Sequence, residues 1–354
     1  MHGGPGRGTS RPVALVRPPM RTIVFALLLL AAPVFAADLP DSTALGRLRS
    51  DARALQPLAH SALGRAFLAA TATLPRVPAR AVWRDSSRTH AWSEREAQAL
   101  PDTMRARLVR RELDESFYWN TRYGSPLAYL RPLELLAENG LGDVKHERIA
   151  DFGCGMLGQL RLLASLGADA TGIDVDPLLR ALYADPGDQG EVEGAKGAKG
   201  RVRLVTGRWP AEDAAAAEVG EGYDLFLSKN TLKNGYLHPE KPVDPRMLVQ
   251  LGVTDSAFVA ALAGTVKSGG LVMIYNLCPA PAPPDKPYIP WADGRCPFPR
   301  ATWEAAGFRV LVFDRDDSPE ARRMGHALGW DQGGSAMDLE RDLFATWTLV
   351  QRKK

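Results

Sequence analysis

The feature that most constrains this chain is a glycine-rich turn at residues 151–158, between a short apolar strand and a helix. It reads Asp-Phe-Gly-Cys-Gly-Met-Leu-Gly, and the next predicted strand ends at Asp174. Glycine lets a backbone turn tightly and approach a ligand closely, and the free amides that open the following helix attract polar groups. An acid at the end of the second strand can accept hydrogen bonds from both hydroxyls of a ribose. The pattern therefore predicts a parallel sheet that binds a nucleoside-containing cofactor.

From residue 141 onward, predicted strands and helices alternate. This rhythm is typical of an α/β fold with a parallel sheet and helices on both faces. Residues 187–200 are rich in Gly and Lys, and we predict a loop there. We expect strands at 149–152, 169–174, 201–206, 223–228, 271–275, 308–313 and 343–350, and helices at 160–166, 177–183, 246–266 and 302–306.

The residues before this α/β part are predicted to be mainly helical. Apolar residues recur at helical spacing from residue 42 to 74, and a third helix is expected at 127–138. Between them, Ser93 is expected to cap a helix over 93–113 that Pro101 breaks or kinks. We therefore divide the chain into a leader at 1–36, a helical region at 37–140 and an α/β domain at 141–354.

The leader has the order of regions found in a secretory signal peptide. Arg21 precedes a ten-residue apolar run from Ile23 to Ala32, and small residues lead to an expected cleavage after Ala36. The run is shorter than the ~20 residues that span a bilayer, so no stable membrane span is expected after cleavage. We predict translation from Met20 and export to the periplasm or the medium, or a cytoplasmic location if the leader does not function.

The charge balance argues against a nucleic acid partner. The 354 residues carry 44 Lys and Arg against 41 Asp and Glu, a formal net charge of +3. Four of these arginines and no acid lie in residues 1–36, so the remaining chain has 40 basic and 41 acidic residues. Basic stripes interleaved with aromatic residues are also absent from the sequence.

Two cofactors compete for the glycine turn. Read literally, Gly153, Gly155 and Gly158 match the dinucleotide fingerprint of NAD enzymes. However, Asp151 lies two residues before the first glycine, where a carboxylate would repel a pyrophosphate. The same carboxylate is favourable beside the positively charged amino acid end of S-adenosylmethionine, which we therefore prefer.

These residues resemble the class I S-adenosylmethionine-dependent methyltransferases, whose Rossmann-like sheet has seven strands. The resemblance covers residues 141–354 and also rests on Thr171–Asp176, Tyr223–Ser228 and Leu262–Ile274. It implies S-adenosylmethionine as cofactor. The residues that it places against the cofactor are Asp151, Gly153, Cys154, Gly155, Asp174, Val175, Arg208, Trp209 and Ser228, with Tyr123 from a segment that folds over the cofactor as a lid.

The sequence departs from the family pattern at two points. Leu157 stands where the third glycine is usual, and Gly207-Arg208-Trp209 replaces the usual Gly-Asp after the third strand. The adenine amino group then lacks its usual acidic partner, and Trp209 could stack on adenine instead. For Tyr118, Trp119, Tyr123 and Tyr129 the alternative to a lid is an aromatic seam between the helical region and the sheet.

Candidates for the chemistry lie after the fourth strand. A methyl acceptor must be held near the methyl group, and a base must take its proton where it has one. Lys229, Tyr236 and His238 are the polar groups expected there, and a solvated loop is the alternative for each. Cys154 has no His placed to activate it as a nucleophile. The His and Cys residues show no metal-binding spacing, so no metal is predicted.

The sequence thus predicts methyl transfer to a small-molecule or protein acceptor that it does not identify. The alternative is an exported, degenerate methyltransferase fold that binds a ligand or a partner, since S-adenosylmethionine is made inside cells. Cys278 and Cys296 flank a proline-rich segment and could form a disulfide or remain free thiols. The oligomeric state is left open.

Overall fold

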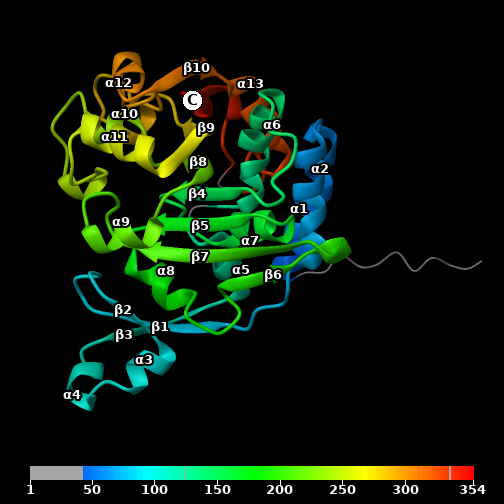
Figure 1. The fold of residues 1–354 in the computed structure, drawn as a ribbon. Helices are drawn as coiled ribbons and strands as arrows, with labels where there is room; N and C mark the ends of the chain where they lie inside the picture. Colours follow the sequence, from blue (N-terminus) through cyan, green and yellow to red (C-terminus); the bar gives the residue numbers. More distant parts are fainter. Residues whose placement is uncertain (1–42, 123, 335) are drawn as a thin grey trace, which may run out of the picture. The chain divides into compact units, whose positions relative to one another are not determined.

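A mostly parallel eight-stranded sheet forms the centre of the chain (Figure 1) in a computed structural model that describes residues 43–122, 124–334 and 336–354. Its strands lie in the order β10-β11-β9-β8-β4-β5-β7-β6. The bounds are β4 (Arg148–Phe152), β5 (Asp169–Asp174), β6 (Gly190–Glu193), β7 (Lys199–Thr206), β8 (Tyr223–Lys229), β9 (Val266–Cys278), β10 (Phe308–Asp316) and β11 (Phe344–Arg352).

The strands β4, β5, β7, β8 and β9 run parallel, and β11 is antiparallel to both of its neighbours, β9 and β10. The parallel strands are buried on both faces, and β8 is accordingly buried at every position except Asp224, which is partly exposed. The seven strands expected from the sequence are all present. The expected Rossmann-like α/β fold is therefore confirmed.

An eighth strand, β6, lies at the sheet edge inside the segment expected to be a loop. It turns back and pairs antiparallel with β7, with Gly190 opposite Val202. Val192 is its one apolar side chain and packs into the core at 6% exposure. The loop prediction was wrong there because backbone pairing and one buried valine suffice for a short edge strand.

Helices cover both faces of the sheet. One face packs against α1 (Ala44–Leu55), α2 (Ala62–Ala69), α6 (Leu130–Glu138), α7 (Gly158–Ser165), α8 (Pro177–Leu182) and α13 (Ser318–Ala327). The other packs against α9 (Asp213–Val219), α11 (Asp255–Thr265) and α12 (Arg300–Ala305). Side chains alternate along a strand, so Ile149 of β4 faces the first layer and Ala150 faces the second.

The helix expected at 246–266 is shorter in the structure. It begins only at Asp255, where the Thr254 side chain accepts from the amide of Ala257 as an N-cap. Gly252 before it has a φ of +75°, a left-handed conformation that ends helical geometry. Residues 239–253, which we call the strap, therefore run as a connection between α10 (Asn234–Leu237) and α11 and contain only the short η5 (Pro245–Met247).

The region before the α/β part is not wholly helical. It contains a three-stranded antiparallel sheet in the order β2-β1-β3, formed by β1 (Arg80–Arg84), β2 (Ala91–Ser93) and β3 (Val109–Leu113). Ser93 caps α3 (Glu94–Gln98) in a capping box with Glu96, as expected. The helix prediction was wrong for 109–113, where pairing with β1 along the whole strand overrides local propensity.

Two buried acids join elements of the fold, Glu134 within the N-terminal helices and Asp317 between these helices and the sheet. Glu134 of α6 is 1% exposed and accepts from the Ser61 hydroxyl at 2.7 Å and from the amides of His60 and Ser61. Asp317 is 5% exposed and accepts from the Arg131 guanidinium at 2.8–3.0 Å and from the Tyr275 hydroxyl at 3.0 Å. These contacts lie within one compact unit, Pro40–Lys354. Packing is continuous across residue 140. The division that we predict there stays a prediction.

The predicted leader at 1–36 and Tyr123 lie outside the described residues. Among the helices that the structure describes, none is both long and apolar enough to cross a membrane.

Candidate functional site

The candidate site lies at the carboxyl edge of the sheet, where the strand order changes direction. The chain moves from β4 through β5 to β7 on one side and then returns to β8 and β9 on the other. In open α/β sheets, ligands bind outside the carboxyl ends of the strands at such a switch point. Asp151 near the end of β4 and Lys229 at the end of β8 therefore belong to this edge.

The glycine turn is held against β5. Gly153 and Gly155 have φ values of +67° and +65°, which glycine adopts without strain. The Gly155 amide donates to Asp174 Oδ2 at 2.9 Å, and the Asp176 amide donates to Asp174 Oδ1 at 2.9 Å. Asp174 thus anchors the turn through Oδ2 and its own following loop through Oδ1, and each oxygen has a further lone pair for a ligand.

A cavity of about 340 Å³ opens beside this turn. It brings together five residues predicted from the sequence, namely Gly153, Asp174, Val175, Arg208 and Trp209. Val175 is 61% exposed, although it is apolar. The cavity is also lined by Phe152, Ile173, Gly207 and, from the strap, Pro245, Arg246, Leu248, Val249 and Gln250.

Trp209 contributes to the wall of this cavity, but most of its ring lies in the core. It is 2% exposed, and its centroid lies 5.2 Å from that of Phe226 and 5.3 Å from that of Phe258. A ring packed in this way is a poor stacking platform, and Val175 is the apolar side chain that is free to cover a flat ligand. The expected stacking of Trp209 on adenine is thus disfavoured.

A second group of polar side chains is buried on the α7 side of β4 and β8. Gln159 of α7 donates to Asp151 Oδ2 at 2.8 Å, whereas Asp151 Oδ1 and Gln159 Oε1 have no partner. Lys229 is 8% exposed, and its Nζ lies 5.3 Å from the ring centroid of Tyr129. Among the described residues, Asp151 and Lys229 form no direct ion pair with each other or with a third group. We call Asp151, Gln159, Lys229 and Tyr129 the polar chamber.

Burial changes the ionisation of both charged groups in the polar chamber. It raises the pKa of Asp151 to about 7, although hydrogen bonds from Gln159 and Tyr129 and the positive charge of Lys229 act in the opposite direction. Burial also lowers the pKa of Lys229 to about 8, against the attraction of Asp151. Buried charges without a hydrogen-bonded partner are costly, and strongly perturbed groups in a cleft mark functional sites.

The other two candidates after β8 lie apart from the polar chamber. Lys233 Nζ lies 5.6 Å from the ring centroid of Tyr236. His238 Nε2 lies 2.9 Å from Asp255 Oδ2 and bridges the two ends of the strap. Ser228, a predicted cofactor contact, is buried and donates to the carbonyl of Phe152 at 3.3 Å.

The aromatic residues of the expected lid are mostly core residues. Tyr118, Trp119 and Tyr129 are each at most 3% exposed, and the Tyr118 ring packs edge-on against Trp119 and Tyr183. These three residues therefore form the aromatic seam that we considered as the alternative to a lid. The segment nevertheless reaches the glycine turn, because the Thr121 hydroxyl donates to the carbonyl of Gly155 at 2.9 Å.

The three cysteines are buried free thiols in the structure, so no Cys278–Cys296 disulfide is formed. Burial raises the pKa of Cys154 well above its ordinary value, which disfavours the nucleophilic thiolate. Within the described ranges, no cluster of three or more His, Cys, Asp or Glu side chains could hold a metal ion.

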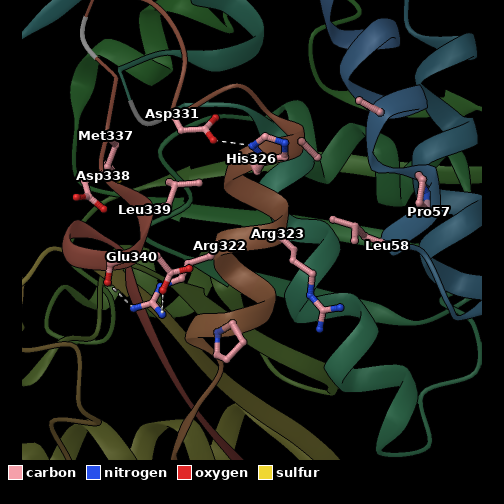
Figure 2. A pocket seen from close by; sticks show the side chains of 13 residues that line it. Pro57, Leu58, Arg322, Arg323, His326, Asp331, Met337, Asp338, Leu339 and Glu340 are labelled. Atoms are coloured by element: carbon pink, nitrogen blue, oxygen red, sulfur yellow. Dashed lines mark hydrogen bonds and ion pairs between the residues drawn. The ribbon is translucent and has the colours of Figure 1, made fainter.

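A larger cavity of about 980 Å³ lies elsewhere, between α13, the end of α1 and α14 (Leu339–Asp342) (Figure 2). Its charged groups are paired within the fold. His326 Nδ1 lies 2.6 Å from Asp331, and Arg322 lies 2.8 Å from Glu340. Figure 2 shows these pairs turned toward each other along the cavity wall. One buried oxygen in this cavity, Asp331 Oδ1, has no hydrogen-bond partner, but the other oxygen of the same carboxylate is paired with His326.

Sequence reasoning missed Gln159 and Gln250. Gln159 follows the glycine turn by one position and would have been found from the first turn of α7. Gln250 lies on the strap, which the sequence presented as helix, so no local signal pointed to it.

No family model matches the chain, and no curated protein does. Solved structures do resemble it. They include the [4+2]-cyclase SpnF (18% identity, 63% of this chain and 80% of that chain, TM-score 0.37) and a putative sarcosine dimethylglycine methyltransferase from Galdieria sulphuraria (12%, 64% and 85%, 0.36). A third is phospholethanolamine N-methyltransferase 2 from Haemonchus contortus, in complex with phosphomonomethylethanolamine and S-adenosylhomocysteine (13%, 70% and 63%, 0.39).

Identities and scores this low say nothing about what the chain does. The fold assignment rests on the sheet itself, through its strand order, the antiparallel β11 and the glycine turn between β4 and α7. On this basis the chain has the Rossmann-like fold of the class I S-adenosylmethionine-dependent methyltransferases, the family that its sequence resembles.

Proposed function

We propose that this protein binds S-adenosylmethionine and transfers its methyl group to a small-molecule or protein acceptor. The observation that carries the proposal is the polar chamber at the switch point. There, a buried carboxylate oxygen of Asp151 has no hydrogen-bonding partner, and Lys229, which is 8% exposed, makes no ion pair with another described residue. A group with both a positive and a negative end would satisfy both residues.

The residues present fit the two halves of this cofactor. Asp151 would hold the ammonium group of its amino acid end, and Lys229 would hold the carboxylate. Asp174 would hold the ribose, and the 340 Å³ cavity with Val175 on its wall would hold the adenine. When bound, the cofactor supplies a methyl group on a positively charged sulfur.

The chain must then position an acceptor and receive its proton. With Lys229 protonated and assigned to the carboxylate, Tyr236 and His238 are the candidates for this second task. We expect one of these two side chains to accept the proton as a general base. We therefore place the acceptor beside the segment that follows β8.

Thermal melting of the full chain tests cofactor binding. S-adenosylmethionine or S-adenosylhomocysteine at 100 times the dissociation constant should add about 2.7 kcal/mol of stability. Asp174→Ala, Asp151→Asn and Lys229→Met should each weaken the shift, whereas the surface variant Glu191→Gln should keep it. No shift with either sulfur compound would contradict the proposal, and a shift with NAD alone would favour the dinucleotide interpretation.

A second candidate function is a degenerate methyltransferase fold that binds a ligand or partner without turnover. It is supported by Asp174, whose two oxygens are engaged by backbone amides, and by Arg208 in place of the usual acid. Transfer of a labelled methyl group from the bound cofactor to any small-molecule or protein fraction would exclude it. Binding without transfer would favour it.

We also propose that the leader exports the protein. The signal-peptide order of residues 20–36 supports this. An alkaline phosphatase fusion after Ala36 should be active outside the cytoplasm, and an inactive fusion would contradict export.

A further inference from the structure

The adenine end of the 340 Å³ cavity lacks the acid that the family uses there. Four polar side chains line this cavity, namely Asp174, Arg208, Arg246 and Gln250. The two arginines are donors only, and Asp174 lies at the end of β5, where the ribose is expected. An adenine amino group is itself a donor, so Arg208 cannot replace the missing acceptor.

Gln250 is the remaining acceptor on this wall. Its side chain is exposed and makes no hydrogen bond to another described residue. A carboxamide presents an acceptor and a donor side by side, which is the arrangement that pairs with the amino group and ring nitrogen of adenine. Arg246, by contrast, is held by Asp244 through two of its nitrogens.

The strap holds Gln250 at a defined place. Its neighbour Leu251 is 7% exposed and packs in the core, and the Val249 amide donates to the carbonyl of Tyr236 at 3.3 Å. His238 and Asp255 join the two ends of the strap at 2.9 Å.

Arg208 packs directly under the strap. A Cβ at Gly252 would lie 2.9 Å from its Cδ, so the glycine allows this close approach. The strap, Arg208 and Gln250 are therefore parts of one wall.

We infer that Gln250 reads the adenine amino group, in place of the acid that the family carries after its third strand. This inference rests on the proposed binding of S-adenosylmethionine. It assigns to the strap, a connection with no helix of its own beyond η5, the role of a specificity-determining wall of the cofactor site.

The test is the affinity of the full chain for two ligands, measured by calorimetry. One is S-adenosylhomocysteine, and the other is its purine analogue without the 6-amino group. A neutral hydrogen bond contributes about 0.5–1.5 kcal/mol, so the wild type should prefer the amino compound by about 2- to 12-fold. Gln250→Leu should lower this ratio to about 1 by weakening only the amino compound, and Gln250→Glu should keep or raise it.

Gln332→Leu, at an exposed position that does not line the cavity, is the matched control and should keep the wild-type ratio. Because Gln250 is exposed, its variants should melt at the wild-type temperature without ligand. A wild-type ratio near 1, or an unchanged ratio in Gln250→Leu, would overturn the role of Gln250 while leaving cofactor binding intact. Failure of the wild type to bind either compound would overturn the proposed function as well.

Discussion

Two regions of this molecule that bury charged side chains differ in how those side chains are hydrogen-bonded. Near the N-terminal helices, Glu134 and Asp317 are surrounded by donors from Ser61, Arg131 and Tyr275. At the carboxyl edge, Asp151 has one oxygen without a hydrogen-bond partner, and Lys229 Nζ lies 5.3 Å from the ring centroid of Tyr129 and makes no ion pair with another described residue.

The difference separates structure from function. A buried acid whose donors are all supplied by the protein holds elements together and has no need of a ligand. A buried acid and a buried ammonium group that do not meet are costly to fold. Their retention is consistent with a ligand that satisfies both, which is the basis of the proposed function.

The largest expected effect is on the unfolding free energy, when the buried ion pair of Arg131 and Asp317 is broken. Arg131→Met would leave the Asp317 carboxylate buried with only Tyr275 as donor, and the unfolding free energy should fall by about 3–5 kcal/mol. Urea denaturation measures this, and cofactor affinity should not change. A loss below 1 kcal/mol would show that this pair is not structural.

Removing the charges of the polar chamber should raise the unfolding free energy rather than lower it. Replacing both charges, in Asp151→Asn with Lys229→Met, removes two poorly satisfied buried ions and should raise the unfolding free energy by about 1–3 kcal/mol at pH 7.5. The same double variant should lose the thermal shift with S-adenosylhomocysteine. A double variant that is less stable than the wild type would place the polar chamber with the structural pairs.

The pH dependence of stability sharpens the comparison. Burial raises the pKa of Asp151 to about 7, so its contribution is fully present below its ordinary pKa near 4 and is lost as the pH rises through 7. Between pH 5 and 6.5 this group alone should lower stability by up to about 1.4 kcal/mol per pH unit.

Urea denaturation across this range should show a flatter profile for Asp151→Asn than for the wild type. Asp174, whose pKa burial also raises, contributes in the same direction and remains in the variant. Identical slopes in the two proteins would show that Asp151 does not titrate as an isolated buried acid.

The smallest expected effect concerns the strap. His238→Asn removes the partly exposed pair with Asp255, which should cost about 0.2–1 kcal/mol of stability. If the pair positions Gln250, the preference for the 6-amino compound should fall with it. Stability loss with an unchanged ligand ratio would limit His238 to a structural role.

Much of the α/β part follows from the sequence. The strand ending at Asp174 and the turn at Gly153 and Gly155 are local patterns of apolar runs and glycine, and the structure has them where expected. The strand at 109–113 and β6 were missed, because each forms through pairing with another strand, β1 and β7 respectively, rather than through its own periodicity.

The sequence by itself determined the class of fold, the edge of the sheet that carries the site and the acids on it, because these depend on local hydrophobic periodicity and on glycine geometry. Only the tertiary structure decided which polar groups meet. The packing of α7 on the sheet brings Gln159 into hydrogen-bond contact with Asp151. The Lys229 ammonium group lies against the ring of Tyr129. The strap positions Gln250 on the wall of the 340 Å³ cavity. Tyr129 and Lys229 are 100 positions apart, and Gln250 lies in a connection without periodicity, so no local pattern encodes these contacts; Gln159 is eight residues from Asp151, but their contact depends on how α7 packs on β4.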